Sequence, residues 1–246
     1  MKKVILYIAA SFISYAAFAQ DNSGDEAKPK SFIAVTGGMS NLMGNITKTD
    51  YHDNSSGYAA AMGYNTGIEG AYFLNKYLGI GGVFSFASFN AASNLQTMSD
   101  GFKKDFGVDS IAVTVTTKYN FFNYLVGPYF AYAYKKFTFD ARVVAGFVYV
   151  TTPEFDIFVE DGGKPHPCAQ NISSAGAFGF QAGLGVRYSI TNKIGLKLGA
   201  DYYSTNPNIT IKNSNRPIAG ARLLTNYHEP ISMMNINLGL IYQFGK

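Results

Sequence analysis

The chain has 246 residues, of which 47% are hydrophobic and 15% charged, and its formal net charge is +4. This apolar content is too high for an intrinsically disordered protein, and the modest charge gives no support for nucleic-acid binding. The mean hydropathy of +0.01 shows no bulk excess of apolar residues. Any membrane-spanning part must therefore be encoded by alternation of side chains instead of long apolar runs.

The N-terminus has the three parts of an export signal. Lys2 and Lys3 precede an apolar run, and Ala17-Phe18-Ala19 provides a cleavage site of the small-x-small type. An uncleaved transmembrane helix is the alternative, but it needs about 20 apolar residues and this run is shorter. We therefore predict a signal peptide over residues 1–19 and a polar leader over residues 20–30.

Three strands are predicted in the first part of the remaining domain, which spans residues 31–246. The first covers about residues 32–40. The next two, 64–72 and 78–86, place their larger apolar residues at even positions, which is the period of a β-strand with two different faces. Leu74-Asn75-Lys76 turns the chain between them, so they form a hairpin.

Four further strands follow as two hairpins. The strands at 124–134 and 137–149 are joined by two lysines, and those at 178–190 and 194–203 by Thr191-Asn192-Lys193. In 178–190 every even position is apolar, while the odd positions hold glycine, glutamine, arginine and serine. Each of these strands alternates in the same way.

A last strand over 231–244 brings the number to about eight. Each strand supplies the roughly 9 to 11 residues that cross a bilayer when the strand is tilted. The other links are long and polar, and they alternate strictly with the short turns; they cover about residues 41–61, 90–121, 151–175 and 204–230. Outer-membrane barrels have short periplasmic turns and long external loops, and an even strand number leaves both termini in the periplasm.

One of the long links contains its own alternating segment, "SIAVTVTTKYN". We expect this segment to project above the membrane as an extended strand. Its apolar residues fall on odd positions from Ile111, whereas those of the following strand fall on even positions from Tyr124. This change of phase predicts a β-bulge between the two.

A soluble eight-stranded barrel is the alternative, with the apolar face filling its interior. Its outer face would be rich in Lys, Glu and Thr, but the polar face here is largely Gly, Ala and Ser with scattered charges. Such a face suits the narrow interior of eight strands, where charges are tolerated only when paired. We predict a polar network that plugs the barrel, made of Glu69, Asp140, Arg142, Gln181, Arg187, Lys197 and Asp201.

Aromatic residues gather beside the short turns and the C-terminus, where rings of this kind mark the headgroup boundary of a membrane. The alternative is that Tyr and Phe simply favour strands. The expected girdle consists of Tyr72, Tyr77, Tyr132, Tyr134, Phe137, Tyr188, Tyr242 and Phe244. A second ring is expected at Tyr64, Phe86, Tyr149, Phe178 and Tyr202.

These segments resemble the small outer-membrane β-barrel family of Gram-negative bacteria, in the style of OmpA-type and PorT-like barrels. The residues that carry the resemblance are "AFAQ", "YLVGPYFAY", "FDARVVAGF", "FGFQAGLGVRYSI" and "INLGLIYQFGK". The resemblance implies a closed, antiparallel, up-and-down transmembrane barrel in the outer membrane. It also implies contact with outer-membrane lipid and lipopolysaccharide, and insertion by the barrel-assembly machinery. It implies no single activity.

Three classes of function fit these observations. The first is a non-enzymatic, monomeric barrel with a structural role or a surface-interaction role, in which the long loops contact an extracellular ligand or protein. The second is a narrow pore for small solutes or hydrophobic ligands, which requires an open interior. The third is a lipid-modifying enzyme, which requires a base held by the barrel wall.

No catalytic, cofactor-binding or metal site is expected. Three loops carry groups that could ligate a metal in principle, but no spacing motif supports a site. These groups are Asp50, His52 and Asp53, then Glu160, Asp161, His166 and Cys168, and finally His228 and Glu229. As the lone cysteine, Cys168 cannot form an internal disulfide.

Overall fold

The computed structural model describes residues 29–50, 56–92, 95–210, 212–213 and 226–245. The predicted signal peptide and most of the predicted leader lie outside the described residues. No helix in the described ranges is long and apolar enough to span a membrane.

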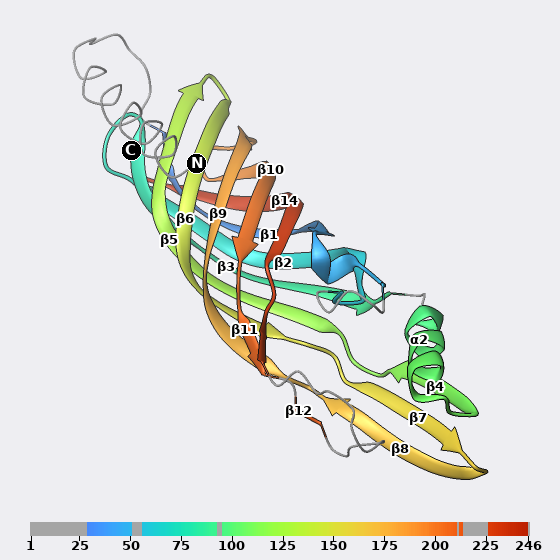
Figure 1. The fold of residues 1–246 in the computed structure, drawn as a ribbon. Coiled ribbons are helices and arrows are strands. Elements are labelled where there is room, and N and C mark those ends of the chain that lie inside the picture. Colours follow the sequence, from blue (N-terminus) through green and yellow to red (C-terminus); the bar gives the residue numbers. More distant parts are fainter. Residues whose placement is uncertain (1–28, 51–55, 93–94, 211, 214–225, 246) are drawn as a thin grey trace.

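Eight antiparallel strands close into a barrel in the order β1-β14-β10-β9-β6-β5-β3-β2 (Figure 1). Their bounds are β1 Ser31–Met43, β2 Ala59–Phe73, β3 Leu78–Ala91, β5 Tyr119–Tyr134, β6 Phe137–Thr151, β9 Ser174–Ser189, β10 Ile194–Thr205 and β14 Ile231–Phe244. β1 pairs with β14 on one side and with β2 on the other, which closes the sheet. The predicted fold class and strand number are confirmed.

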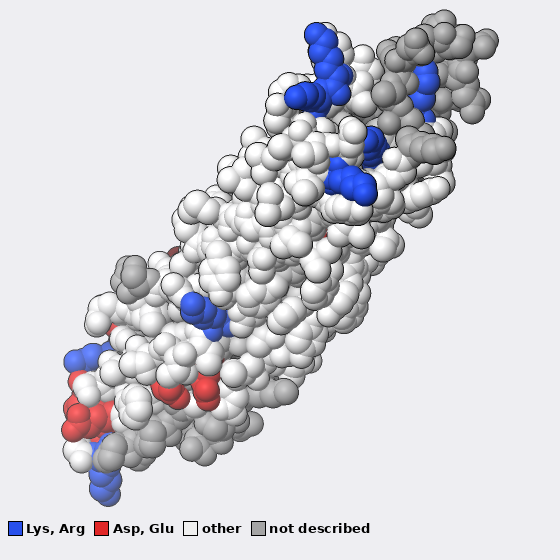
Figure 2. Space-filling model, turned by 180° about the vertical axis from the view of Figure 1, so that it is seen from behind, with Lys and Arg blue, Asp and Glu red and all other residues white. Residues whose placement is uncertain are grey.

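The period-two pattern determines which side chains point outward. In β10 the even residues Leu196 and Leu198 are exposed, whereas Lys197 between them is buried. The same holds for every predicted apolar row, so the large exposed apolar residues of the barrel lie on its outer surface. Figure 2 shows the result as a broad band almost without charged side chains, with Lys, Arg, Asp and Glu gathered at the two ends.

The two ends of the barrel differ in the length of their connections. The turn end carries the links at 74–77, 135–136 and 190–193, together with the start of β1 and the end of β14. The pairing of Ser31 with Phe244 places these last two side by side. The loop end carries all the long links.

At the loop end, three neighbouring barrel strands continue as a second sheet. This sheet has the order β12-β8-β7-β4. Its strands β8, β7 and β4 are continuous in the chain with the barrel strands β9, β6 and β5, which are neighbours in the same order. Figure 1 shows the extension and the helix α2 beside β4, at the end opposite the short turns. The elements are α2 Gln96–Phe106, β4 Ser110–Val115, β7 Phe155–Asp161, β8 Lys164–Asn171 and β12 Lys212–Asn213.

Two smaller elements of the described residues also lie at the loop end. A 3-10 helix, η1, covers Asn45–Thr47, and a two-strand sheet pairs β11 (Asn208–Thr210) with β13 (Asn226–His228). The helix α2 was not expected from the sequence. It ends at Phe106, and the next residue, Gly107, caps it with a positive φ of 63°.

The predicted projecting strand is confirmed as β4, which pairs with β7. The bulge expected after it is wrong. Residues 116–118 separate β4 from β5 instead, and odd residues lie on the less exposed side of both strands. In β4 the apolar residues occupy the less exposed odd side. In β5 the odd side lines the barrel interior, and the even side, which carries the apolar row, faces outward.

The interior is more apolar than the sequence suggested. Besides charges and small residues, a buried cluster fills it, and toward the loop end this cluster includes Phe89, Phe121, Val148, Tyr203 and Met233. Burial of such side chains stabilises the fold by about 1.5–3 kcal/mol each. The expectation of an inner face made largely of Gly, Ala and Ser with charges holds only for part of the barrel.

Candidate functional site

The seven residues of the predicted polar network all point into the barrel. They come from four strands: Glu69 from β2, Asp140 and Arg142 from β6, Gln181 and Arg187 from β9, and Lys197 and Asp201 from β10. None of them is more than 4% exposed. Six of the seven are charged, with three acids and three bases.

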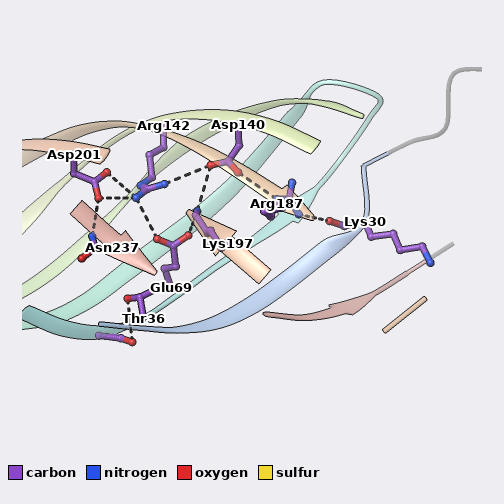
Figure 3. A network of polar contacts seen from close by, with 10 residues as sticks. Lys30, Thr36, Glu69, Asp140, Arg142, Arg187, Lys197, Asp201 and Asn237 are labelled. Atoms are coloured by element: carbon purple, nitrogen blue, oxygen red, sulfur yellow. Dashed lines mark hydrogen bonds and ion pairs between the residues drawn. The ribbon is translucent and has the colours of Figure 1, made fainter. Parts of the chain in front are cut away.

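Arg142 joins all three acids. Its Nη2 donates to Asp201 Oδ2 over 2.8 Å and lies 3.2 Å from Glu69 Oε2, and its Nη1 lies 3.4 Å from Asp140 Oδ1 (Figure 3). Asn237 of β14 donates a further hydrogen bond to Asp201 over 3.2 Å. The network therefore ties β2, β6, β10 and β14 together across the interior.

The other two cations complete the balance. Lys197 forms ion pairs with Glu69 and, over 3.3 Å, with Asp140. Arg187 Nε lies 3.2 Å from Asp140 Oδ2, and its Nη1 donates to the backbone oxygen of Lys30 over 3.0 Å. Every charge of the network thus has an opposite charge within ion-pair distance, which is the condition for burying it.

Glycines on β9 leave the space that the carboxylates occupy. Gly183 lies opposite Asp201 and Arg142, and Gly185 lies opposite Asp140. A Cβ atom on Gly185 would lie 2.7 Å from Asp140 Oδ1, and one on Gly183 would overlap the Asp201 carboxylate. The alternating glycines of this strand are therefore needed for the ion pairs of its neighbours.

Aromatic rings surround the cations, and sequence reasoning missed them. The guanidinium of Arg187 lies 4.2 Å from the ring centroid of Phe32, Lys197 Nζ lies 5.0 Å from the same centroid, and Arg142 lies 5.9 Å from that of Tyr129. Such cation–π contacts stabilise buried cations. The sequence contained a signal for Tyr129: it has an odd number, and the odd positions of its strand β5 face the interior.

Gln181 is buried on β9 opposite Tyr203 and Val144. It is the uncharged member of the predicted set.

The predicted aromatic girdle lies on the outer surface at the turn end. Tyr134 pairs with Phe137, Phe137 with Tyr188, and Ile194 with Tyr242 in the register of the sheet. The rings also contact one another, with centroids 5.1 Å apart for Phe137 and Tyr188. All eight members, Tyr72, Tyr77, Tyr132, Tyr134, Phe137, Tyr188, Tyr242 and Phe244, are exposed or half-buried.

The loop groups that could ligate a metal do not form a site in the part of the chain that the structure describes, where no group of three or more His, Cys, Asp and Glu side chains could hold an ion. His52 and Asp53 lie outside the described residues, as do the side chains of His166 and Cys168. His228 is exposed on β13, and Glu229 beside it is buried. Burial, and to a smaller extent the negative charge of the neighbouring Glu229, together raise the pKa of Tyr227 to about 12.

A closed barrel with an apolar outer band and a charged, paired interior defines an integral membrane barrel of the outer-membrane type. Residues 5–244 match the family described as "Outer membrane protein beta-barrel domain". The chain belongs to this family, and it is a small outer-membrane β-barrel protein of the Gram-negative type.

Solved structures of similar fold include the attachment invasion locus protein Ail of Yersinia pestis, at 13% identity and a TM-score of 0.44, and Neisserial surface protein A, at 10% and 0.44. Both matches cover 89% of this chain and 100% of the other. The outer membrane protease OmpT from Escherichia coli is similar at 10% identity and a TM-score of 0.41, over 91% of this chain and 99% of that one. A comparison with curated proteins finds no match.

Replacing Arg142 with Met should destabilise the barrel by about 3–5 kcal/mol, because buried carboxylates then lose their shared cation. Unfolding by urea in lipid vesicles, followed by circular dichroism, measures the change. The double variant R142M/D201N removes one charge of each sign and should be more stable than R142M alone. A double variant that is no more stable than R142M would contradict the charge-balance account.

Replacing Gly183 with Ala should cost about 1–3 kcal/mol, because the added methyl group overlaps the Asp201 carboxylate. Gly199→Ala is the matched control. Gly199 also faces inward, but a Cβ there would meet its nearest atom, Arg142 Nη2, at 3.6 Å. The same unfolding measurement should separate the two variants, and equal stabilities would show that Gly183 is not needed for the network.

Proposed function

We propose that this protein is a non-conducting, non-enzymatic outer-membrane barrel that acts at the cell surface through its loop end, as a contact protein or as a stabiliser of the envelope. The observation that carries the proposal is the contrast between the two parts of the chain. The barrel interior is filled by paired charges and apolar side chains, while the loop end is built into an additional sheet.

The sheet at the loop end has the form of a projecting platform. Its strands β7 and β8 contain seven and eight residues, which corresponds to about 23–26 Å of extended chain. The two strands meet in a tight turn at Gly162 and Gly163, which have φ of 58° and 70°, as a two-residue hairpin turn requires. The turn is exposed, so it is available for contacts.

The platform combines apolar and charged contact groups. Phe158 is 55% exposed, whereas its neighbour Val159 is buried. Asp161 and Lys164 flank the hairpin turn and are exposed. Exposed aromatic and charged residues on one surface element are typical of surfaces that bind a partner.

The orientation that goes with this role places the loop end outside the cell and both termini in the periplasm. The protein would be inserted as a monomer by the barrel-assembly machinery. Its outer band and girdle would then contact outer-membrane lipid and lipopolysaccharide. The uncharged band of Figure 2 supports the lipid contact.

A pore is less well supported than a contact role. Solute would have to pass both the ion pairs around Arg142 and the apolar cluster that includes Phe121 and Tyr203, all of which are almost fully buried. A lipid-modifying enzyme would need a free base, but the charged groups of the barrel wall are engaged with one another.

The folded protein in a planar bilayer should give no steady conductance, because its interior is closed by side chains. Single-channel recording measures this, with a porin in the same bilayer as the positive control. Labelling of a cysteine at Gly162 in a C168S background, with an impermeant maleimide on intact cells, verifies that the loop end is outside. Regular single-channel steps from the wild type would contradict the proposal and favour the pore.

A further inference from the structure

A polar pocket lies at the turn end of the barrel, at the mouth of its interior and opposite the loop-end platform. Its volume is about 480 Å³, which is within the range of small-molecule sites. Lys30, Lys135 and Lys136 line it, together with the inward-facing Thr138, Ser189 and Gln243. None of the residues that line it is acidic.

The lysines of this pocket have no carboxylate partner among the described residues. Lys30 Nζ donates to the backbone oxygen of Asn192 over 3.0 Å, and Lys135 Nζ lies 5.4 Å from the ring centroid of Tyr134. Figure 3 shows the Lys30 side chain extending away from the charged network. Figure 2 shows Lys and Arg at both ends of the molecule, whereas most of the Asp and Glu visible on this face lie at the loop end.

The network below the pocket does not neutralise these charges. Its three acids are already matched by Arg142, Arg187 and Lys197, so the pocket lysines add an excess positive charge. Arg187 lies next to the pocket, since its Nη1 donates to the backbone of Lys30. Its Nη2 is buried and has no hydrogen-bond partner among the described residues.

The inner wall of the pocket supplies polar groups that are almost fully buried. Gln243 is 4% exposed and Thr138 is 9% exposed. Gln243 Nε2 donates to Ser189 Oγ over 3.1 Å, which fixes the position of both side chains. Ammonium groups at a rim and hydroxyl or amide groups behind them suit an anion with several acceptor oxygens.

We propose that this pocket is a binding site for a phosphate group. The group is carried either by an anionic phospholipid headgroup of the adjacent leaflet or by a small soluble phosphate ester. Lysine ammonium groups bind phosphate as point charges, and basic residues near a membrane surface attract anionic lipid. The site is separate from the loop-end contact role and does not depend on it.

The test uses the full-length protein folded in a neutral detergent and two probes. Glycerol 3-phosphate, measured by calorimetry, represents the soluble source. Phosphatidylglycerol compared with phosphatidylcholine, measured by native mass spectrometry, represents the headgroup. The lysine variant combines Lys30→Ala, Lys135→Asn and Lys136→Ala. Asparagine is chosen at position 135 because Lys135 has a positive φ of 55°.

The wild type should bind at least one of the two probes, and the lysine variant should bind that probe at least tenfold more weakly. The loop-end control K103A/K104A/K118A removes three charges at the opposite end of the barrel, and its affinity should stay within twofold of that of the wild type. The variant K30R/K135R/K136R keeps the charges and should retain binding. Heat-modifiable migration on gels verifies that each variant is folded.

The two arms separate the sources of phosphate. Loss of glycerol 3-phosphate binding in the lysine variant supports the site with a soluble ligand, and loss of the preference for phosphatidylglycerol supports it with a lipid headgroup. The proposal is overturned if the wild type binds neither probe. It is also overturned if the lysine variant and the loop-end control lose binding equally.

Discussion

Charge pairing inside a closed sheet is the constraint on which the rest of this structure depends. A barrel that crosses a bilayer must satisfy its backbone hydrogen bonds between strands, and closure gives every strand one inward face and one outward face. Three carboxylates on inward faces are tolerable only because Arg142, Arg187 and Lys197 lie within ion-pair distance. The partners come from strands that are distant in the sequence, so the network also links these strands across the interior.

The same constraint explains the composition of the inner wall. Carboxylates and guanidinium groups need room to approach one another, and Gly183 and Gly185 provide it by lacking side chains. Where the ion pairs end, apolar residues such as Phe121 and Tyr203 fill the space. Together these two layers occupy the interior, which leaves the loop end and the pocket at the turn end as the places where the protein can meet other molecules.

The sequence predicted the barrel closely because period-two alternation is a local property. Rows such as Leu196 and Leu198 could be assigned to the outer face directly, and the members of the charged network followed from their position on the other face. The pairing within the network could not be predicted, because the contact between Lys197 and Glu69 depends on the register of strands far apart in the chain. The sheet β12-β8-β7-β4 was missed as a unit for the same reason, since β4 and β7 are paired only through tertiary structure. The helix α2 was missed because it lies within a segment that was assigned to a long polar link. The apolar part of the interior was missed because Phe121 lies in a segment that was assigned to a long link, and because Tyr203 lies on the face that was expected to be small and polar.

The central claim is that the apolar rows contact lipid, and accessibility measurements by electron paramagnetic resonance test it most directly. Spin labels would be attached to single cysteines at Leu184, Leu198 and Leu238 in a C168S background, with the protein folded in vesicles. The account predicts frequent collisions with oxygen and few with a water-soluble nickel complex at all three positions, and the reverse for a label at Gly162. Easy access of the nickel complex to the three leucine positions would contradict it.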